Sequence, residues 1–263
     1  MPPIVLSIAG FDPSSGAGVT ADLKTIAAHG CYGVGSLTAL TVQSTQGVSR
    51  VEPVSAELVT QTLESLADDL DIAAIRIGML GSAAVASAVA GFLSTMDWKN
   101  GVLDPVLRSS SGAELLDSAG QDVLIKQLLP WARVVTPNLA EAAALSGMPL
   151  ARNVADMAEA AEALQNLGAK DVLITGGHLP GNVDVLLTAV GEVHQIAGAR
   201  VDSKATHGTG CALATAIACN LALGMDVLSA AQAAKEYIRQ AIEAAYPIGK
   251  GSGPMNHLFK IKR

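Results

Sequence analysis

The chain has 263 residues, of which 50% are hydrophobic and only 3% aromatic, and its formal net charge at pH 7 is −7. With 17 Lys and Arg residues and no basic run longer than residues 260–263, nucleic acid and anionic membranes are poor partners. The apolar run at the N-terminus is too short for a signal peptide, and no apolar span approaches ~18 residues. The three cysteines lie outside any metal-binding spacing, which favours a reduced, cytoplasmic protein.

Short apolar strands and amphipathic helices alternate along the chain. Strands are predicted at 4–9, 35–42, 48–53, 73–77, 101–103, 132–135 and 170–174, followed by a hairpin of 183–190 and 192–199. Helices are predicted at 19–29, 55–68, 82–96, 113–129, 138–146, 153–167, 211–223 and 227–244. This alternation predicts an α/β fold with a mainly parallel sheet covered on both faces. Because composition never shifts along the chain, a single domain over residues 1–263 is expected.

Polar or turn-forming residues follow the apolar strands again and again. Six such clusters occur, at residues 10–12, 43–45, 78–79, 104–105, 136–138 and 175–178. In a parallel sheet these strand ends share one edge, which is the edge where ligands bind. The sequence therefore predicts one extended ligand site.

The segment Gly208-Thr209-Gly210-Cys211 leads directly into an alanine-rich helical run. A helix N-terminus carries unpaired N–H groups and a positive dipole end, and glycines let backbone approach a phosphate. The dipole is also expected to lower the pKa of the Cys211 thiol, which would make it available as a base or nucleophile. A capped helix with a buried cysteine would show the same residues.

Asn138 and Glu141 lie three residues apart, so they share one face of a helix. An amide and a carboxylate placed there could hold hydrated Mg²⁺ beside phosphates, with Asp104 as a second carboxylate. The alternatives are a capping-box pair for Asn138 and Glu141 and an ordinary turn aspartate for Asp104.

Gln43 carries a donor and an acceptor on one planar group, which suits the edge of a nitrogen heterocycle. A solvent-facing glutamine at a strand end would look the same. Asp22 is expected to face either the pocket or solvent, and Lys204 and His207 are candidates for local positive charge near Gly208.

Segments spread over nearly the whole chain resemble the hydroxymethylpyrimidine/phosphomethylpyrimidine kinases of thiamine biosynthesis. Together and in this order the matches are highly specific. They comprise residues 8–18 (IAGFDPSSGAG), 21–25, 38–48 (TALTVQSTQGV), 77–80 (IGML), 104–106 (DPV), 136–142 (TPNLAEA), 176–178 (GGH), 206–211 (THGTGC) and 253–257 (GPMNH).

The resemblance implies a ribokinase-like three-layer α/β/α fold and two ATP-dependent phosphorylations. The first converts 4-amino-5-hydroxymethyl-2-methylpyrimidine to its monophosphate, and the second converts the monophosphate to the diphosphate. It also implies a homodimer that works with ATP and Mg²⁺ on a small-molecule pyrimidine.

The resemblance further implies roles for individual residues. Gly208, Thr209, Gly210 and Cys211 would be catalytic, with Cys211 at the position where sugar kinases carry an aspartate base. Gln43, Gly10, Asp22, Met79 and Val106 would bind the pyrimidine. Asn138, Glu141, Thr175, Lys204 and His207 would bind ATP, and Asp104 and Glu141 would bind the metal.

Four positions depart from the family pattern, namely Phe11, Arg76, Ser110 and Thr175. A bulky Phe11 is expected to narrow the pocket. An uncharged Thr175 lacks the positive charge that a lysine there would offer a phosphate, and Arg76, Arg108 and Lys204 are the candidates to substitute for it. Two other functions fit the same residues, a pyridoxine/pyridoxal kinase and a non-catalytic pyrimidine-binding module.

Overall fold

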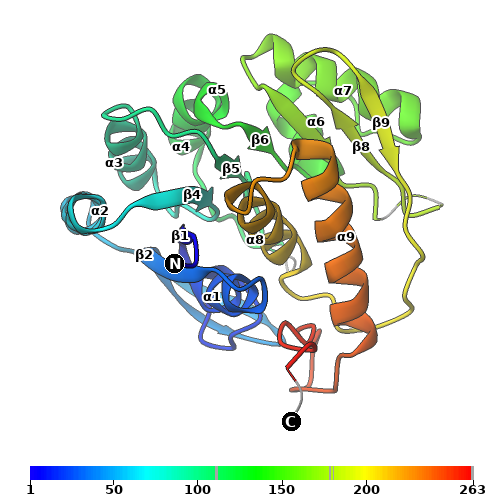
Figure 1. The fold of residues 1–263 in the computed structure, drawn as a ribbon, viewed down its shortest axis with the longest axis horizontal. Coiled ribbons are helices and arrows are strands. Elements are labelled where there is room, and N and C mark those ends of the chain that lie inside the picture. Colours follow the sequence, from blue (N-terminus) through cyan, green and yellow to red (C-terminus); the bar gives the residue numbers. More distant parts are fainter. Residues whose placement is uncertain (110–111, 178, 180, 262–263) are drawn as a thin grey trace.

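The protein is a layered α/β structure built around one nine-stranded sheet (Figure 1). The computed structural model describes residues 1–109, 112–177, 179 and 181–261. The sheet order is β3-β2-β1-β4-β5-β6-β7-β8-β9. The five pairings from β2 through β1, β4, β5 and β6 to β7 are parallel, whereas β3 and the β8–β9 pair are antiparallel additions.

The elements have the following bounds. The strands are β1 Ile4–Phe11, β2 Tyr32–Ser44, β3 Gly47–Pro53, β4 Ile72–Ile77, β5 Gly101–Leu103, β6 Val134–Val135, β7 Asp171–Ile174, β8 Asp184–Leu187 and β9 Val193–Ile196. The helices are α1 Gly18–Ala28, α2 Ala56–Asp69, α3 Ala83–Leu93, α4 Ser118–Val123, η1 Leu124–Leu128, α5 Leu129–Trp131, α6 Leu139–Ser146, α7 Val154–Asn166, α8 Thr209–Ala222 and α9 Val227–Glu243.

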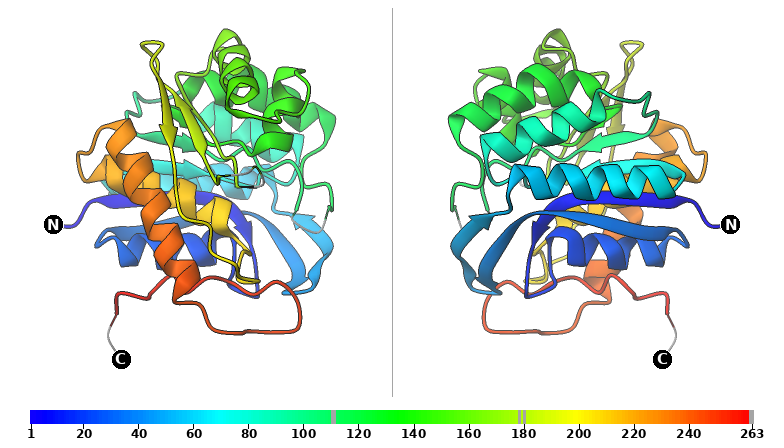
Figure 2. Two further views of the ribbon diagram at one scale, coloured as in Figure 1. Left: turned by 90° about the vertical axis from the view of Figure 1, so that its right-hand side faces the viewer. Right: turned by 90° about the vertical axis from the view of Figure 1, so that its left-hand side faces the viewer.

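Helices cover both faces of the sheet because its central strands are apolar on both sides. Leu6 and Ile8 of β1 face the layer formed by α2 to α7, and Val5 faces α1, α8 and α9. The two views of Figure 2 show these layers on either side of the sheet. The expected ribokinase-like three-layer α/β/α arrangement with a mainly parallel sheet is confirmed.

Helix α8 is buried on every side, although the sequence suggested an amphipathic helix. It packs against the sheet and is flanked by α1 and α9, so small residues such as Ala214 and Ala218 have no exposed surface. A helix enclosed in this way tolerates few polar residues on any face. Its N-terminus is therefore fixed rigidly at the edge of the sheet.

The predicted helix at 113–129 is wrong over its first five residues. Leu115 N donates to the Leu107 carbonyl at 2.9 Å, so this segment runs back as an extended strand-like arm. The side chain of Asp117 then accepts from Gly120 N and caps α4, which begins at Ser118. The helical run continues through one π-helical turn, η1, and through α5 as far as Trp131. Across the described ranges, no helix combines the length and hydropathy that a membrane crossing requires.

Candidate active site

A cavity of about 1510 Å³ opens at the edge of the sheet where the parallel strands end. Single small-molecule sites usually occupy roughly 300–1,000 Å³, so this cavity has room for two ligands. Thirteen of the fifteen predicted site residues line it. These are Gly10, Gln43, Met79, Asp104, Val106, Asn138, Glu141, Thr175, His207, Gly208, Thr209, Gly210 and Cys211.

The N-terminus of α8 is an open anion site. Gly208 is its N-cap, and no side chain caps the helix. Gly208 has a φ of 77°, and a Cβ there would lie 1.8 Å from the Gly16 carbonyl oxygen, so only glycine fits. Because the first-turn N–H groups lack a side-chain cap beside a cavity, they can bind an anionic group.

Cys211 lies in the first turn of α8, partly exposed to the cavity, and its thiol contacts Arg76 and Asp104. The expected lowering of its pKa is wrong. Burial, followed by repulsion from Asp104 and Asp22, outweighs the attraction of Arg76 and raises the pKa of the Cys211 thiol to about 12. With no ligand bound, this environment favours the neutral thiol form of Cys211 at neutral pH.

At the floor of the cavity, which Arg76 helps to line, lies an ion cluster whose centre is Arg76. Its Nη1 donates to Asp22 Oδ2 at 2.9 Å and its Nη2 to Asp104 Oδ2 at 2.6 Å, and the Arg76 side chain has no exposed surface. Gly78 makes room for the guanidinium, because a Cβ there would lie 2.1 Å from Nη1. Arg76 thus fixes the position of the cavity-lining Asp104 from below.

The expectation that Asp22 contacts the substrate needs correction. Asp22 is fully buried and does not line the cavity. Its carboxylate accepts hydrogen bonds from Ser7 Oγ at 2.6 Å, from Thr215 Oγ1 at 2.7 Å and from Arg76. Asp22 therefore serves the ion cluster, because α1 packs this side chain inward against β1 and α8.

Asn138 and Glu141 form the capping box that was the alternative to a metal role. Asn138 Oδ1 accepts from Ala140 N and Glu141 N, and Glu141 Oε2 accepts from Asn138 N at 2.9 Å. Glu141 nevertheless lines the cavity beside Asp104. Burial, with added repulsion from Asp104, raises the pKa of Glu141 to about 8.

The donor chemistry at Asp104 and Glu141 suits Mg²⁺. Among the described residues, no three His, Cys, Asp or Glu side chains gather as a ready-made metal cluster. Mg²⁺ does not require one, since it keeps several waters and is held by one or two carboxylates together with substrate phosphates. A cation between two repelling carboxylates would relieve the repulsion that raises the pKa of Glu141.

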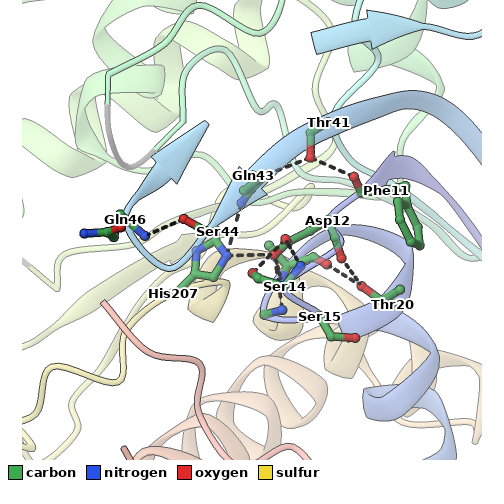
Figure 3. A network of polar contacts seen from close by, with 12 residues as sticks. Phe11, Asp12, Ser14, Ser15, Thr20, Thr41, Gln43, Ser44, Gln46 and His207 are labelled. Carbon is green, nitrogen blue, oxygen red and sulfur yellow. Dashed lines mark hydrogen bonds and ion pairs between the residues drawn. The ribbon is translucent and has the colours of Figure 1, made fainter. Parts of the chain in front are cut away.

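Gln43 belongs to a polar network that joins β2, the β1–α1 loop and the start of α8 (Figure 3). Its amide stands 3.2 Å from His207 Nε2 on one side and 3.1 Å from Thr41 Oγ1 on the other. His207 Nε2 also lies 2.8 Å from Asp12 Oδ2. His207 thus lies between Asp12 and Gln43.

An apolar wall adjoins this network. Met79 packs with Ala39 and Leu115, and Val51 and Val106 complete the cluster. Gly10 belongs to the same wall, because a Cβ there would lie 3.0 Å from Met79 Sδ. This wall and the Gln43 amide line the same cavity, a combination of apolar surface and one polar group that is typical of sites for ring-shaped ligands.

The other end of the cavity is formed by β7 to β9 and α9. Lys235 Nζ lies 2.7 Å from Asp184 Oδ2, and Thr175 lines the cavity nearby, with its N–H donating to the Pro137 carbonyl. Lys204 is exposed and does not line the cavity, so its predicted ATP contact is not supported. Two positions singled out in the sequence, Ser110 and His178, lie outside the described residues.

Sequence reasoning gave no role to several residues of the site. Asp12 was visible only as part of a strand-end cluster, and its partner His207 is 195 residues away. Lys235 is a lysine on the strongly amphipathic α9, where nothing in the local pattern separates it from solvent-facing neighbours. Arg76 was considered only for a phosphate contact, although an arginine inside a buried apolar strand already signals a charged partner.

An open α/β sheet with an uncapped helix N-terminus beside a cavity large enough for two ligands fits a small-molecule kinase of the ribokinase-like fold. Residues 12–256 match the sequence model of a family described as phosphomethylpyrimidine kinase. The chain is 44% identical over 263 residues to a hydroxymethylpyrimidine/phosphomethylpyrimidine kinase of Rhizobium meliloti, covering 99% of this chain and 98% of that protein. The chain belongs to the phosphomethylpyrimidine kinase family, whose members are phosphotransferases.

Two further similarities bear on function. The chain is 42% identical over 260 residues to a thiamine biosynthesis bifunctional protein of Geobacter sulfurreducens, covering 97% of this chain and 52% of that protein. A solved structure of an ADP complex of Bacillus subtilis pyridoxal kinase has a TM-score of 0.89 at 35% identity, covering 98% of each chain.

Proposed function

We propose that the protein uses ATP to phosphorylate 4-amino-5-hydroxymethyl-2-methylpyrimidine to the monophosphate, and then the monophosphate to the diphosphate, in thiamine diphosphate biosynthesis. The observation that carries this proposal is the single cavity in which Gln43 and the uncapped N-terminus of α8 face the same space. One end suits a nitrogen heterocycle and the other suits a phosphate. Family membership supports the same reaction.

In the proposed reaction the substrate hydroxyl oxygen attacks the γ-phosphorus of ATP, and the bond from that phosphorus to the β–γ bridging oxygen breaks. The N–H groups of residues 208–211 would stabilise charge on the transferred phosphoryl group. Cys211 would first release its own proton to solvent, and the resulting thiolate, stabilised by the charge of Arg76, would contact the hydroxyl and accept its proton.

The remaining roles follow the lining of the cavity. We assign the pyrimidine to Gln43, Gly10, Met79 and Val106. Asn138, Glu141, Thr175 and His207 would contact ATP. Asp104 and Glu141 would hold Mg²⁺, which would supply charge stabilisation at the phosphates when bound.

The direct test is to incubate the protein with ATP, Mg²⁺ and the hydroxymethylpyrimidine, and to detect mono- and diphosphate by mass spectrometry. Formation of neither product would contradict the proposal. Loss of ATP only when the pyrimidine is present would exclude a non-catalytic binding module.

Pyridoxal kinase is the second candidate, because a solved pyridoxal kinase shares the fold over 98% of the chain. Turnover of the aminopyrimidine alcohol and of pyridoxal, measured side by side at equal concentrations, would separate the two. We expect the higher kcat/KM for the aminopyrimidine.

We further propose that residues 1–263 form one catalytic domain, that it acts in the cytoplasm and that it is a homodimer. One continuous sheet supports the single domain, and the three free thiols suit a reducing compartment. Leu40 and Val42 on the outer face of β2 are 48% and 58% exposed, which supports a second copy covering that face. Light scattering after size exclusion would give the oligomeric state.

A further inference from the structure

We infer that Thr41, His207 and Asp12 fix the Gln43 amide in one orientation, and that this orientation selects heterocycles with an acceptor ring nitrogen next to an exocyclic donor. The inference rests on the proposed function and deepens it. The orientation decides whether the nitrogen or the oxygen of the Gln43 amide faces each polar atom on the edge of the heterocycle. Figure 3 shows Gln43 between Thr41 and His207.

On one side of the amide, Thr41 can act only as an acceptor. Its hydroxyl lies 2.9 Å from the Phe11 carbonyl oxygen and 3.1 Å from the Gln43 amide. A hydroxyl has one proton, and a carbonyl oxygen can only accept, so that proton is donated to Phe11. The amide atom that faces Thr41 must therefore be the donor, which is the nitrogen.

On the other side, His207 Nε2 can act only as a donor. Asp12 accepts from Ser14 N and Oγ at 2.8 and 2.7 Å, and from Gly16 N and Ala17 N at 3.2 and 2.9 Å. These hydrogen bonds, together with the one from His207, favour the charged carboxylate and lower the pKa of Asp12 despite its burial. A carboxylate 2.8 Å from Nε2 requires a proton on that nitrogen.

The two sides agree on one amide orientation, with Oε1 toward His207 and Nε2 toward Thr41. In the structure Nε2 stands nearer His207, and a half-turn about the last side-chain bond exchanges the two atoms. Without that turn, the Thr41 hydroxyl would need two protons, one for Phe11 and one for Gln43. His207 Nε2 would need a proton for Asp12 and a free lone pair for the Gln43 nitrogen. After the turn, the Gln43 nitrogen donates to Thr41, and the one proton on His207 Nε2 is shared between Asp12 Oδ2 at 2.8 Å and the Gln43 oxygen at 3.2 Å, so no two donors face each other.

The oriented amide leaves one N–H and one oxygen lone pair for a ligand. The N–H on the Thr41 side pairs with an acceptor ring nitrogen, and the oxygen on the His207 side pairs with an amino group. In the proposed substrate the carbon bearing the hydroxymethyl group lies beyond the amino group. This pose therefore directs the hydroxymethyl group past His207 toward Gly208 and the start of α8, whereas the reversed edge would direct it away.

The test compares two substrates that differ at this edge. The amino compound has a ring acceptor beside a donor, and its 4-oxo counterpart has a ring N–H donor beside a carbonyl acceptor. We expect wild-type kcat/KM to favour the amino compound by at least about 100-fold, since a site built for one hydrogen-bond order rejects the other. Equal use of both compounds would overturn the inference.

Thr41→Val removes the acceptor that holds Nε2 while keeping the side-chain shape. We expect this variant to lose at least about 10-fold of the substrate preference, mainly through KM for the amino compound, and Thr41→Ser to restore it. Ser49→Ala is the matched control, because Ser49 donates to the Val42 carbonyl on the same hairpin but outside the cavity, and it should keep the wild-type preference. An unchanged preference in Thr41→Val would overturn the role of Thr41.

A second variant keeps the test decisive if Thr41→Val does not fold, as judged by its melting temperature. Gln43→Glu offers no donor in either orientation, so its preference between the two substrates should fall close to one. Failure of the proposed function is a different result, namely no phosphorylation of the amino compound by the wild type. In that case, calorimetric binding of the two heterocycles without ATP still measures the preference, and equal affinities would overturn the inference.

Discussion

Nη2 of Arg76 donates to Oδ2 of Asp104 at 2.6 Å under the floor of the cavity, and the same guanidinium reaches Asp22 with Nη1. Removing the guanidinium would leave two buried carboxylates without a counter-charge, which costs about 3–5 kcal/mol. We expect Arg76→Met to lower the melting temperature by roughly 10 °C, and Arg76→Lys to lower it less. Calorimetry checks this, with Arg50→Met as the control because the Arg50–Glu52 pair is exposed. A melting temperature equal to wild type in Arg76→Met would show that the carboxylates need no counter-charge.

A substitution at Gly210 tests anion binding by α8 without weakening the helix. A Cβ at this position would meet open space, and alanine is favoured over glycine inside a helix by up to about 1 kcal/mol. We expect Gly210→Ala to melt at the same or a higher temperature, yet to show a raised KM for ATP and a lower kcat because the methyl group obstructs the phosphoryl group. Wild-type kinetics in this variant would place the phosphate elsewhere.

Glu141 has a capping role and a proposed metal role, and two substitutions tell them apart. Glutamine can replace glutamate in a capping box, so Glu141→Gln keeps the hydrogen bond to Asn138 N and removes only the charge. We expect Glu141→Gln to require a higher Mg²⁺ concentration for half-maximal turnover with little loss of stability. Glu141→Ala should in addition melt at a lower temperature. If the Mg²⁺ titration of Glu141→Gln matches that of the wild type, Glu141 is a cap alone.

Cys211 is expected to act on turnover rather than on affinity. Proton transfer by a positioned side chain contributes roughly 10²–10⁴-fold, so Cys211→Ala should lower kcat by at least about 100-fold with a similar KM for the pyrimidine. The pKa of about 12 adds a second readout, since alkylation of Cys211 by iodoacetamide should be slow at pH 7.5 and accelerate as the pH rises. Turnover at the wild-type rate would reduce Cys211 to a packing residue.

The buried His257 leads us to expect that the stability of the folded protein falls in acid. His257 is 3% exposed, its Nε2 has no hydrogen-bond partner among the residues that the structure describes, and burial next to Lys24 lowers its pKa to about 4. Between pH 6.5 and 4 the unfolded chain therefore binds a proton that the folded protein excludes, so stability falls as the pH falls. The loss at pH 4 amounts to about 3 kcal/mol.

Urea unfolding at pH 7.5 and pH 5 measures this loss. We expect His257→Gln to show a flatter dependence on pH than the wild type, and His194→Gln, which changes a half-buried histidine on β9, to keep the wild-type slope. A wild-type slope in His257→Gln would assign the acid response to other groups.

The alternation of strands and helices was predictable because it depends on local apolar periodicity, and the strand ends located the cavity edge. What local pattern could not show is how distant groups meet. The helix dipole at Cys211 is a local effect, whereas its pKa is raised first by burial and then by carboxylates that come from α1 and from the end of β5. Asp22 looked like a surface helix residue because its partners Ser7, Arg76 and Thr215 belong to three other elements.

The error at 113–129 has a similar origin. Leu115 and Leu116 continue an apolar helical pattern in the sequence, but Leu115 joins Met79 at the cavity wall and Leu116 enters the core from an extended arm. The cap at Asp117 was the local signal for the true start of α4. The burial of Leu115 and Leu116 against distant parts of the chain decides between a helix and an extended arm, and the local sequence does not show that burial.

Gly16 of the β1–α1 loop meets residues from the opposite end of the chain. Its carbonyl lies under Gly208, and a Cβ on Gly16 would stand 2.3 Å from the His207 ring and 3.2 Å from Pro254. During synthesis, the β1–α1 loop therefore cannot make these contacts until nearly the whole chain has left the ribosome. Contacts of such long sequence separation slow folding, so we expect the sheet to assemble first and the catalytic end to be ordered last.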